Sequence, residues 1–318
     1  MVDLVALRAL LAVDETGSVA AAAATTGYTP SAVSQQIKRM ERELGVTLLD
    51  RVGRGVALTD PARRLVRHGR EALRHLELAA AQLDGPDEAP RGTVRIAAFA
   101  TAVRGLVAPL LADVPARWPD LVPELVEADP ADAVALVASG QADLAVVHNW
   151  VGIALHRPDH VDGVPLGLDV ADLLVHRDHP LAARPVVRPA ELLGEAWAST
   201  PAGSICHAWF TLMFAGFERL PPVRYWSGEF ATHVRLVAAG AAVALVPRLG
   251  RGALPPEVVA VPVTDPVPTR QIEVLWRATM AGSAPVRQVT ARLRSLAAEP
   301  SFARDAAAGA DAGQLRQA

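Results

Sequence analysis

The sequence contains very little cysteine or lysine and has no long apolar run. Cys206 is the only cysteine among 318 residues, which excludes an internal disulfide and favours a reducing compartment. Lys38 is the only lysine among 31 basic residues, so abundant arginine alone says little about function. The longest apolar run, 236–247, is interrupted by Gly240 and falls short of the roughly 20 residues that cross a bilayer. Since the N-terminus carries Asp3 and lacks a basic segment and a cleavage site, we predict no secretory signal and expect a cytoplasmic protein without a membrane span.

The sequence motifs of common enzymes and metal sites are also missing. There is no GxSxG, no GxxxxGK loop and no GxGxxG after a predicted strand, and the nine histidines are scattered without a Cys/His cluster. We therefore predict no catalytic residue, no metal site and no cofactor, and an enzyme is disfavoured.

Charge is distributed unevenly, although the net charge is only -3. Residues 1–83 hold 11 basic and 9 acidic side chains, whereas the rest of the chain holds 20 and 25. The N-terminal part is therefore the one that could face a polyanion. A chain of this length, with 51% hydrophobic residues, should form two or three globular domains.

Three short helices are predicted within the first 45 residues. Gly17 ends the first helix, Ser18 caps an alanine-rich second helix that ends near Gly27, and Thr29 caps a third that begins with Pro30. The third helix carries an apolar stripe, spaced by three and four residues, at Val33, Ile37, Met40 and Leu44. Its opposite stripe is polar and basic and consists of Ser31, Ser34, Gln35, Lys38 and Arg42.

This arrangement is typical of a helix-turn-helix, in which the second of two short helices enters the major groove. Short hydroxyl and amide side chains can reach base edges, while Lys38 and Arg42 lie where phosphates would be. A merely solvated charged face explains the same residue types equally well. The next segment favours DNA, because DRVGRGVALTD at 50–60 predicts a short hairpin with Arg51 and Arg54, and such a basic wing contacts phosphates or the minor groove.

A long helix is predicted from Thr59 or Asp60 to about Leu83. Apolar and small residues recur along it at threes and fours, from Ala62 to Leu83, as in a helix that packs against a partner. The alternative is that this face packs only on its own domain. A long helix between two domains favours pairing with its own copy, so we expect a homodimer that binds two half-sites.

Residues 2–66 resemble the winged helix-turn-helix of LysR-type transcriptional regulators. The resemblance is carried by GSVAAAAATTGYTPSAVSQQIKRMERELGVTLLDRVGRGVALT, in particular by the Ala22-Ala23 pair, Ser34, Gly45 and the Leu58-Thr59 pair. It implies a DNA-binding transcription regulator that forms a homodimer or homotetramer, binds promoter DNA and a small-molecule effector, and has RNA polymerase as a further possible partner.

The chain departs from the family pattern at Pro30, where a glutamine is frequent. Proline has no side-chain hydrogen bond to offer a base, so specificity is expected from residues just beyond it. The predicted DNA contacts are Thr29, Ser31, Ser34, Gln35, Lys38, Arg42, Arg51 and Arg54.

The rest of the chain alternates strand and helix patterns after a Pro/Gly-rich charged linker at 84–92. This alternation predicts a parallel α/β sheet in two sets that cross at about 163–166 and 263–270. By resemblance, it is the two-lobed, periplasmic-binding-protein-like effector domain of the same family. The implied organisation is a DNA-binding domain at 1–59, a dimerisation helix and linker at 60–90, an effector domain at 91–300 and a disordered tail at 301–318. Lobe I would comprise 91–164 and 268–299, and lobe II 165–267.

In that family the ligand lies where strands end and helices begin, and helix N-termini favour anions. A small carboxylate is the leading effector class, and an amino-acid-like effector is an alternative. The predicted effector-binding residues are Phe99, Ala100, Thr101, His148, Asn149, Thr200, Ser204, Trp226, Glu229 and Pro247.

Several of these residues have a simpler explanation. Thr101 and Ser204 fit helix caps better than ligand contacts when each is considered alone. His148 could be a structural histidine bonded to the backbone, and Cys206 fits a buried, inert thiol better than an oxidant sensor. A solute-binding protein built on the two-lobed domain is the main alternative function. The missing export signal and the N-terminal helices argue against it.

Overall fold

The computed structural model describes residues 2–52, 55–81, 83, 85 and 88–299. The chain divides into two compact units, 1–83 and 84–318, and each is described by itself. The tail at 301–318, predicted to be disordered, and Arg54 of the predicted wing lie outside the described residues. None of the described helices is long and apolar enough to span a bilayer.

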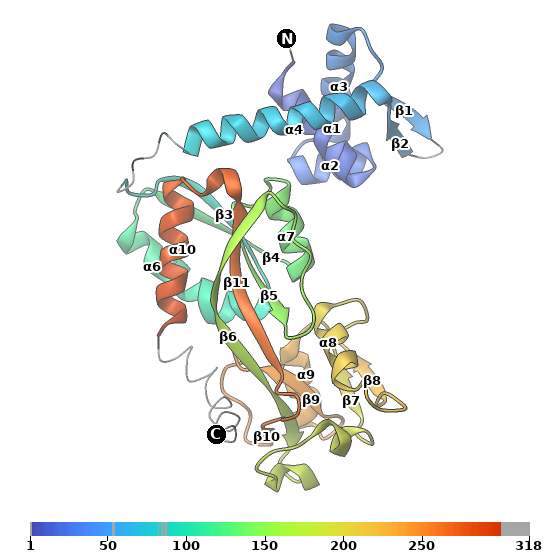
Figure 1. Cartoon of the computed structure of the whole chain (residues 1–318), viewed down its shortest axis with the longest axis vertical. Helices are drawn as coiled ribbons and strands as arrows, with labels where there is room; N and C mark the ends of the chain where they lie inside the picture. The colour runs from blue at the N-terminus through green and yellow to red at the C-terminus, as the bar shows by residue number, and fades with distance from the viewer. Residues whose placement is uncertain (1, 53–54, 82, 84, 86–87, 300–318) are drawn as a thin grey trace. The chain divides into compact units, whose positions relative to one another are not determined.

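The N-terminal unit is a helical bundle with a hairpin (Figure 1). Its elements in chain order are α1 (Leu4–Thr16), α2 (Val19–Thr26), α3 (Pro30–Leu44), β1 (Leu49–Val52), β2 (Gly55–Leu58) and α4 (Asp60–Ala81). The predicted caps are confirmed. Gly17, Gly27 and Gly45 adopt left-handed conformations after the first three helices, as a C-terminal glycine cap requires. The Oγ1 of Thr29 accepts a hydrogen bond from the Ala32 amide (3.2 Å), and β1 pairs with β2 in an antiparallel hairpin.

The buried stripe of α3 anchors it in this unit. Val33, Ile37 and Met40 are at most 2% exposed and pack in one cluster with α1, α2 and α4. The prediction that Leu44 belongs to the buried stripe is wrong, because Leu44, the last residue of α3, is 39% exposed. Glu41 links the end of α3 to the segment that leads into β1, since its Oε1 accepts hydrogen bonds from the amides of Leu48 (2.7 Å) and Leu49 (3.2 Å).

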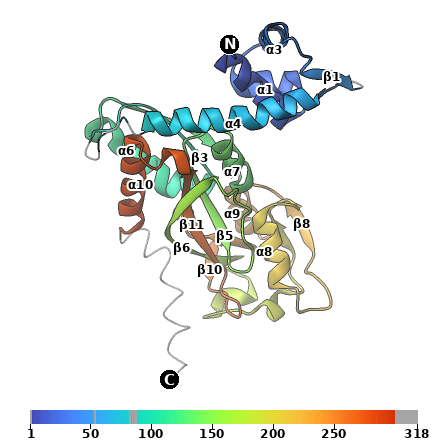
Figure 2. The ribbon, with the colours of Figure 1, turned by 45° about the horizontal axis from the view of Figure 1, so that its top comes forward.

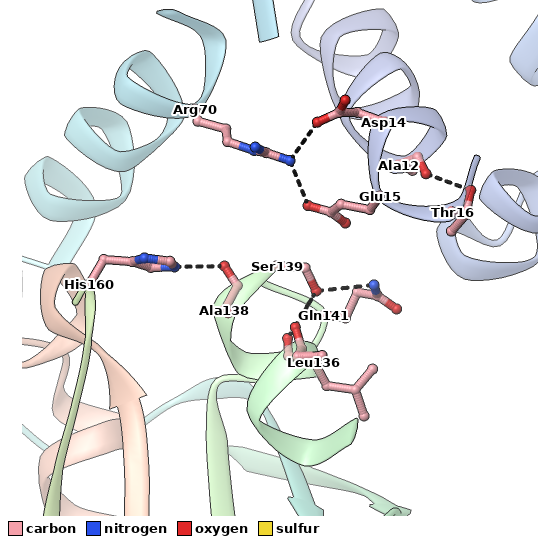
Figure 3. A network of polar contacts seen from close by, with 11 residues as sticks. Ala12, Asp14, Glu15, Thr16, Arg70, Leu136, Ala138, Ser139, Gln141 and His160 are labelled. Carbon is pink, nitrogen blue, oxygen red and sulfur yellow. Dashed lines mark hydrogen bonds and ion pairs between the residues drawn. The ribbon is translucent and has the colours of Figure 1, made fainter. Parts of the chain in front are cut away.

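Helix α4 begins in this cluster and continues as a single long rod (Figure 2). Ala62 and Val66 are buried against the bundle, and Arg70 ties the helix to α1 through Asp14 (2.9 Å) and Glu15 (3.5 Å), as Figure 3 shows. Farther along, Leu76 is 51% exposed. The second half of α4 therefore carries apolar side chains that its own unit does not cover.

The second unit is built on a seven-stranded mixed sheet in the order β10-β6-β11-β5-β3-β4, with β9 also paired to β6. Its strands are β3 (Gly92–Ala98), β4 (Leu121–Glu127), β5 (Leu144–Trp150), β6 (Val161–His176), β9 (Ala244–Pro247), β10 (Val258–Val261) and β11 (Thr269–Arg277). Within this sheet, the predicted parallel pairing is found for β3 with β4 and β5. Strands β6 and β11 run antiparallel to their neighbours.

Alternating side chains of the sheet pack against helices on both faces. The face of Ile96, Val146 and Ile272 packs against the helical run after β3 and against α10. That face is covered by α5 (Ala100–Ala102), the π-helical η1 (Val103–Val107), α6 (Ala108–Arg117) and α10 (Ala284–Ala297). The other face, with Ala145 and Val147, packs against α7 (Pro130–Ala138).

The remaining elements surround the far end of β6. They are η2 (Pro180–Ala183), η3 (Pro189–Leu192), β7 (Trp197–Ser199), α8 (Ile205–Met213), β8 (Val223–Trp226) and α9 (Phe230–Ala238). The short η4 (Ala278–Met280) follows β11 at the opposite end, beside the start of β6. Strands β7 and β8 form a separate parallel pair. Strand β6 pairs with β11 along Val161–Val170 and with β9 along Ala171–Leu174. One continuous strand therefore belongs to both halves of this unit.

Candidate DNA interface and effector site

The predicted DNA-reading face of α3 is open to solvent. Ser31, Gln35, Lys38 and Arg42 are exposed, and Ser34 is half-buried. The hydroxyls of Thr29 and Ser31 lie 3.0 Å apart. Because the opposite face of α3 is buried in its own unit, these polar side chains can all face one partner.

A shallow hollow lies beside the C-terminal half of α3. It is lined by Gln35, Lys38, Arg39, Glu41, Arg42, Gly45, Val46 and Thr47. Three of the predicted DNA contacts therefore meet at one place, and Arg39 joins them there, a residue that the sequence prediction left out. Arg39 is paired with Glu43 (3.0 Å), one turn farther along the helix.

The predicted wing lies after α3. Arg51 is exposed on β1, where it is the register partner of Val56 on β2. Short, solvated β-hairpins of this kind can follow a DNA backbone.

In the C-terminal unit, Thr101 does not cap a helix. The helix start at Phe99 has no side-chain cap, and the Oγ1 of the buried Thr101 accepts a hydrogen bond from Nη2 of Arg270 (2.7 Å). The ring of Phe99 lies 5.0 Å from the same guanidinium and 4.7 Å from the ring of His148. Ala100 begins α5 directly beside them.

His148 and Asn149 lie on opposite faces of β5, because successive side chains of a strand alternate. His148 is buried, and its Nε2 lies 3.9 Å from Sγ of Cys206, so the alternative of a backbone-bonded histidine is wrong. Asn149 points to the other face. There it donates to Glu273 Oε1 (3.0 Å) and accepts from the Leu155 amide (2.6 Å), so the structure does not bring it together with His148.

The other predicted effector residues are divided between the interior and the surface. Ser204 caps α8, since its Oγ accepts from the His207 amide (3.1 Å), and it donates to Oγ1 of Thr200 (2.9 Å). Pro247 is buried at the end of β9. Trp226 is 51% exposed and contacts the ring of His207 at 5.1 Å. Glu229 is exposed at the start of α9.

Sequence reasoning missed the centre of this site, Arg270. Its side chain is fully buried and pairs with Asp169, with Nη2 2.7 Å and Nε 2.8 Å from Oδ2. The other carboxylate oxygen of Asp169 accepts from the Leu249 amide (3.0 Å). An isolated arginine at the start of a predicted strand gives no sequence signal of burial. The two aspartates in the largely apolar strand segment GLDVADLLVH, Asp169 and Asp172, did indicate that buried cationic partners were needed.

A second buried ion cluster lies three residues along β6. Asp172 accepts two hydrogen bonds from Arg248 (2.6 and 2.8 Å) and one from Arg251 (2.9 Å). These two arginines are 8% and 15% exposed. Because Asp172 and Asp169 are three positions apart on β6, their side chains lie on opposite faces of the strand. The cluster of Asp172, Arg248 and Arg251 is therefore separate from the pair of Arg270 and Asp169.

Burial sets the protonation states near this site. It lowers the pKa of His148 well below its usual value, and the positive charge of Arg270 lowers it further. Burial raises the pKa of the Cys206 thiol, and this outweighs the opposite effects of Arg270 and of the indole N–H of Trp150. His148 is therefore neutral and Cys206 a thiol at pH 7. Within the described part of the chain, no group of three or more metal-ligating side chains is found.

Comparison with known proteins identifies both units. Residues 4–63 match the bacterial regulatory helix-turn-helix protein, lysR family, and residues 87–298 match the LysR substrate binding domain. The chain is 31% identical over 243 residues to the small neutral protease regulatory protein of Streptomyces coelicolor, covering 74% of this chain and 70% of that one. It is also 31% identical over 186 residues to the HTH-type transcriptional regulator DgdR of Burkholderia cepacia. That match covers 54% of this chain and 63% of DgdR, less than two thirds of its length.

Solved structures share the fold along nearly the whole chain. A full-length OxyR variant from Pseudomonas aeruginosa superposes with a TM-score of 0.69 at 18% identity, over 92% of this chain and 95% of that one. Full-length CbnR complexed with its target DNA gives a TM-score of 0.53 at 21% identity, over 93% and 99%. The winged helix-turn-helix, the effector-binding domain and these relatives show that the chain belongs to the LysR family and is a DNA-binding transcriptional regulator rather than an enzyme.

Proposed function

We propose that this regulator acts in the cytoplasm as a homodimer or homotetramer that binds promoter DNA and responds to a small carboxylate-bearing effector. The proposal assigns the DNA contacts to Thr29, Ser31, Ser34, Gln35, Lys38, Arg42, Arg51 and Arg54. Within this set, the serines and Gln35 would contact base edges, and the basic side chains would contact phosphates. Effector binding would alter how paired subunits sit on the promoter, where RNA polymerase is a further possible partner.

The carboxylate assignment rests on one observation, the fully buried guanidinium of Arg270, whose Nη1 has no hydrogen-bond partner among the described residues. Leaving a buried cationic donor unpaired is costly, so this site favours an anionic ligand. Of the proposed effector residues, Phe99 and Thr101 contact Arg270 directly, and His148 contacts the ring of Phe99.

The DNA assignment is tested by mobility shifts on the DNA upstream of the chain's own gene. Ser34→Ala and Gln35→Ala should weaken binding to this site more than binding to unrelated DNA. Lys38→Ala should weaken both and lower the salt dependence of binding, because a phosphate contact releases counterions. Gln141→Ala, an exposed change in the other unit, is the control. Unchanged binding by all three α3 variants would exclude this reading face.

The effector assignment is tested by a thermal-shift screen of small carboxylic acids, each paired with its uncharged primary amide. An acid that stabilises the protein while its amide does not supports the proposal. An effector that binds equally well as the amide contradicts the carboxylate assignment.

A further inference from the structure

Four side chains lie on one face of three adjacent strands, beside the ends of β5 and β11. The register pairs Arg270 on β11 with Trp150 on β5 and with Asp169 on β6. His148 lies two residues before Trp150, and therefore on the same face. The rings of His148 and Trp150 are 6.1 Å apart, and the guanidinium of Arg270 is 6.0 Å from the Trp150 ring.

This cluster contains hydrogen-bond donors that have no acceptor. Asp169 and Thr101 occupy Nε and Nη2 of Arg270, but Nη1 of Arg270, Nε1 of Trp150 and Nδ1 of His148 are buried without a hydrogen-bond partner in the described chain. The indole N–H of Trp150 lies near the sulfur of Cys206, which is only a weak acceptor. Leaving a buried donor unpaired costs about 1 to 3 kcal/mol, so three at one place indicate a missing partner.

The state of Cys206 decides the role of the His148 ring. The thiol keeps its proton because burial raises its pKa, and its Sγ lies 3.9 Å from Nε2 of His148. A thiol that donates to Nε2 leaves the ring proton of the neutral imidazole on Nδ1. His148 then offers a third N–H alongside those of Arg270 and Trp150.

The missing partner must accept hydrogen bonds without donating any. The carboxylate of Asp169 is already engaged by Arg270 and the Leu249 amide. An ionised carboxylate has two acceptor oxygens and no donor, and its negative charge suits the guanidinium of Arg270. Cys206 is half-buried at the start of α8, so the cluster lies close to the surface at this point.

We infer that Nη1 of Arg270, Nε1 of Trp150 and Nδ1 of His148 together bind the acid group of the effector. This inference rests on the proposed function and identifies the binding site for the acid group. Asp169 and Thr101 fix the guanidinium so that its third nitrogen faces the ligand. Trp150 and His148 then distinguish an acid from its amide, because an amide nitrogen would place a donor against donors.

The experiment uses the full-length protein with acetate as the probe and acetamide as its uncharged counterpart. All six tryptophans lie after residue 84, so indole N–H resonances of ¹⁵N-tryptophan-labelled protein report on this unit alone. Acetate should shift the Trp150 resonance in a saturable way, and acetamide should not.

Trp150→Phe keeps an aromatic ring against Trp209 (4.9 Å between the two indoles) and removes the N–H together with one of the two fused rings. It should weaken acetate binding about tenfold to a hundredfold, as expected for one hydrogen bond to a charged group. The remaining indole resonances and a thermal shift measure the affinity. Trp276→Phe is the matched control. The indole nitrogen of Trp276 is also buried without a partner in the described chain, but Trp276 lies six residues after Arg270 on β11, away from the cluster. It should leave acetate binding unchanged.

Two results would overturn the inference: an acetate titration that leaves the Trp150 resonance unmoved, or equal weakening by the two tryptophan variants. Arg270→Lys provides a second test, since it keeps the charge that pairs with Asp169 but loses the third nitrogen, and it should also weaken acetate binding.

Failure of the proposed function gives a different result. If a carboxylic acid from the screen alters promoter binding equally in wild type and Trp150→Phe, the acid binds at another site and the proposed function is retained. If no acid alters promoter binding while acetate binds at Trp150, the acid-binding site is retained and the proposed regulatory role is excluded.

Discussion

At the residue scale, the hydroxyl of Thr101 matters because it accepts a hydrogen bond from a buried cation. Thr101→Val keeps the shape but leaves Nη2 of Arg270 with one partner fewer. We expect a loss of about 1 to 3 kcal/mol in the free energy of unfolding. Urea unfolding followed by tryptophan fluorescence measures it in the C-terminal unit alone.

Thr211→Val is the control, because its hydroxyl bonds only to a carbonyl within its own helix (3.1 Å). We expect a change within about 0.5 kcal/mol. Equal losses for both variants would contradict a special role for the contact between Thr101 and Arg270.

The buried histidines predict how stability depends on pH. Burial lowers the pKa values of His148 and His233 in the folded protein, so the unfolded chain binds more protons once the pH falls below about 6.5. The C-terminal unit should therefore be most stable above that pH and lose stability as the pH falls toward the folded pKa values. Urea midpoints between pH 7.5 and 5.5 test this.

His148→Gln should reduce the fall in the urea midpoint, whereas His160→Gln, at an exposed ring near the Ala138 carbonyl (Figure 3), should leave it intact. A fall of the same size in the His148 variant would show that other groups cause the pH dependence.

The site could be predicted only in part from single residues. Phe99, Thr101 and His148 were predicted together because they lie at the ends of predicted strands, where such sites form, and the structure places them near Arg270. Arg270 and Asp169 were missed because their meeting depends on antiparallel pairing between strands about 100 residues apart, which local sequence does not encode. Asn149 was placed beside His148 by sequence proximity, but strand alternation turned it to the opposite face.

At the element scale, the contact of α5 and η1 with the loop after β9 depends on glycine. Gly250 has a φ of 64°, and a Cβ there would overlap the carbonyl oxygen of Thr101. Gly252 has a similar φ of 72°, with nothing within 4 Å of its Cβ position. Gly252→Ala should cost about 1 to 2 kcal/mol from backbone strain alone, and Gly250→Ala more than about 3 kcal/mol because it adds a clash.

Urea unfolding of the two glycine variants separates strain from packing. Equal losses would mean that the close approach of the two segments is not rigid. The first segment is π-helical at Val103–Val107, so relaxation there is the route by which the clash could be relieved.

Elements with strong local signals were predicted well. The first three helices, their glycine ends and the hairpin follow from caps and spacing that act within a few residues. The direction of strands in the sheet was predicted less well, because an alternating strand and helix pattern usually means parallel pairing. Here the long β6 and the returning β11 reverse the direction, and only contacts distant in sequence determine that.

At the scale of the whole molecule, the second half of α4 predicts self-association. Leu76 belongs to the seam of α4, the apolar and small residues that recur at threes and fours along the helix, such as Gly69, Leu73, Leu76 and Ala80. It is 51% exposed, which is typical of a helix face that packs against a partner helix. Leu76→Glu should shift the protein from dimer or tetramer toward smaller species in light scattering after size exclusion.

Leu78→Glu is the matched control, since Leu78 is 38% exposed on the same helix but off the seam. It should leave the assembly unchanged. If Leu76→Glu also leaves the mass unchanged, this seam does not hold the copies together.

The continuous strand β6 limits how the C-terminal unit can respond to a ligand. Its first ten residues pair with β11 and its last six with β9 and β10, and Asp169 lies just before the change of partner. Two bodies joined by loops can swing apart freely, but two bodies that share one strand can move only by twisting it. An effector held at Arg270 would act where β6 changes partner, so we expect it to cause a small rotation about this strand with little opening.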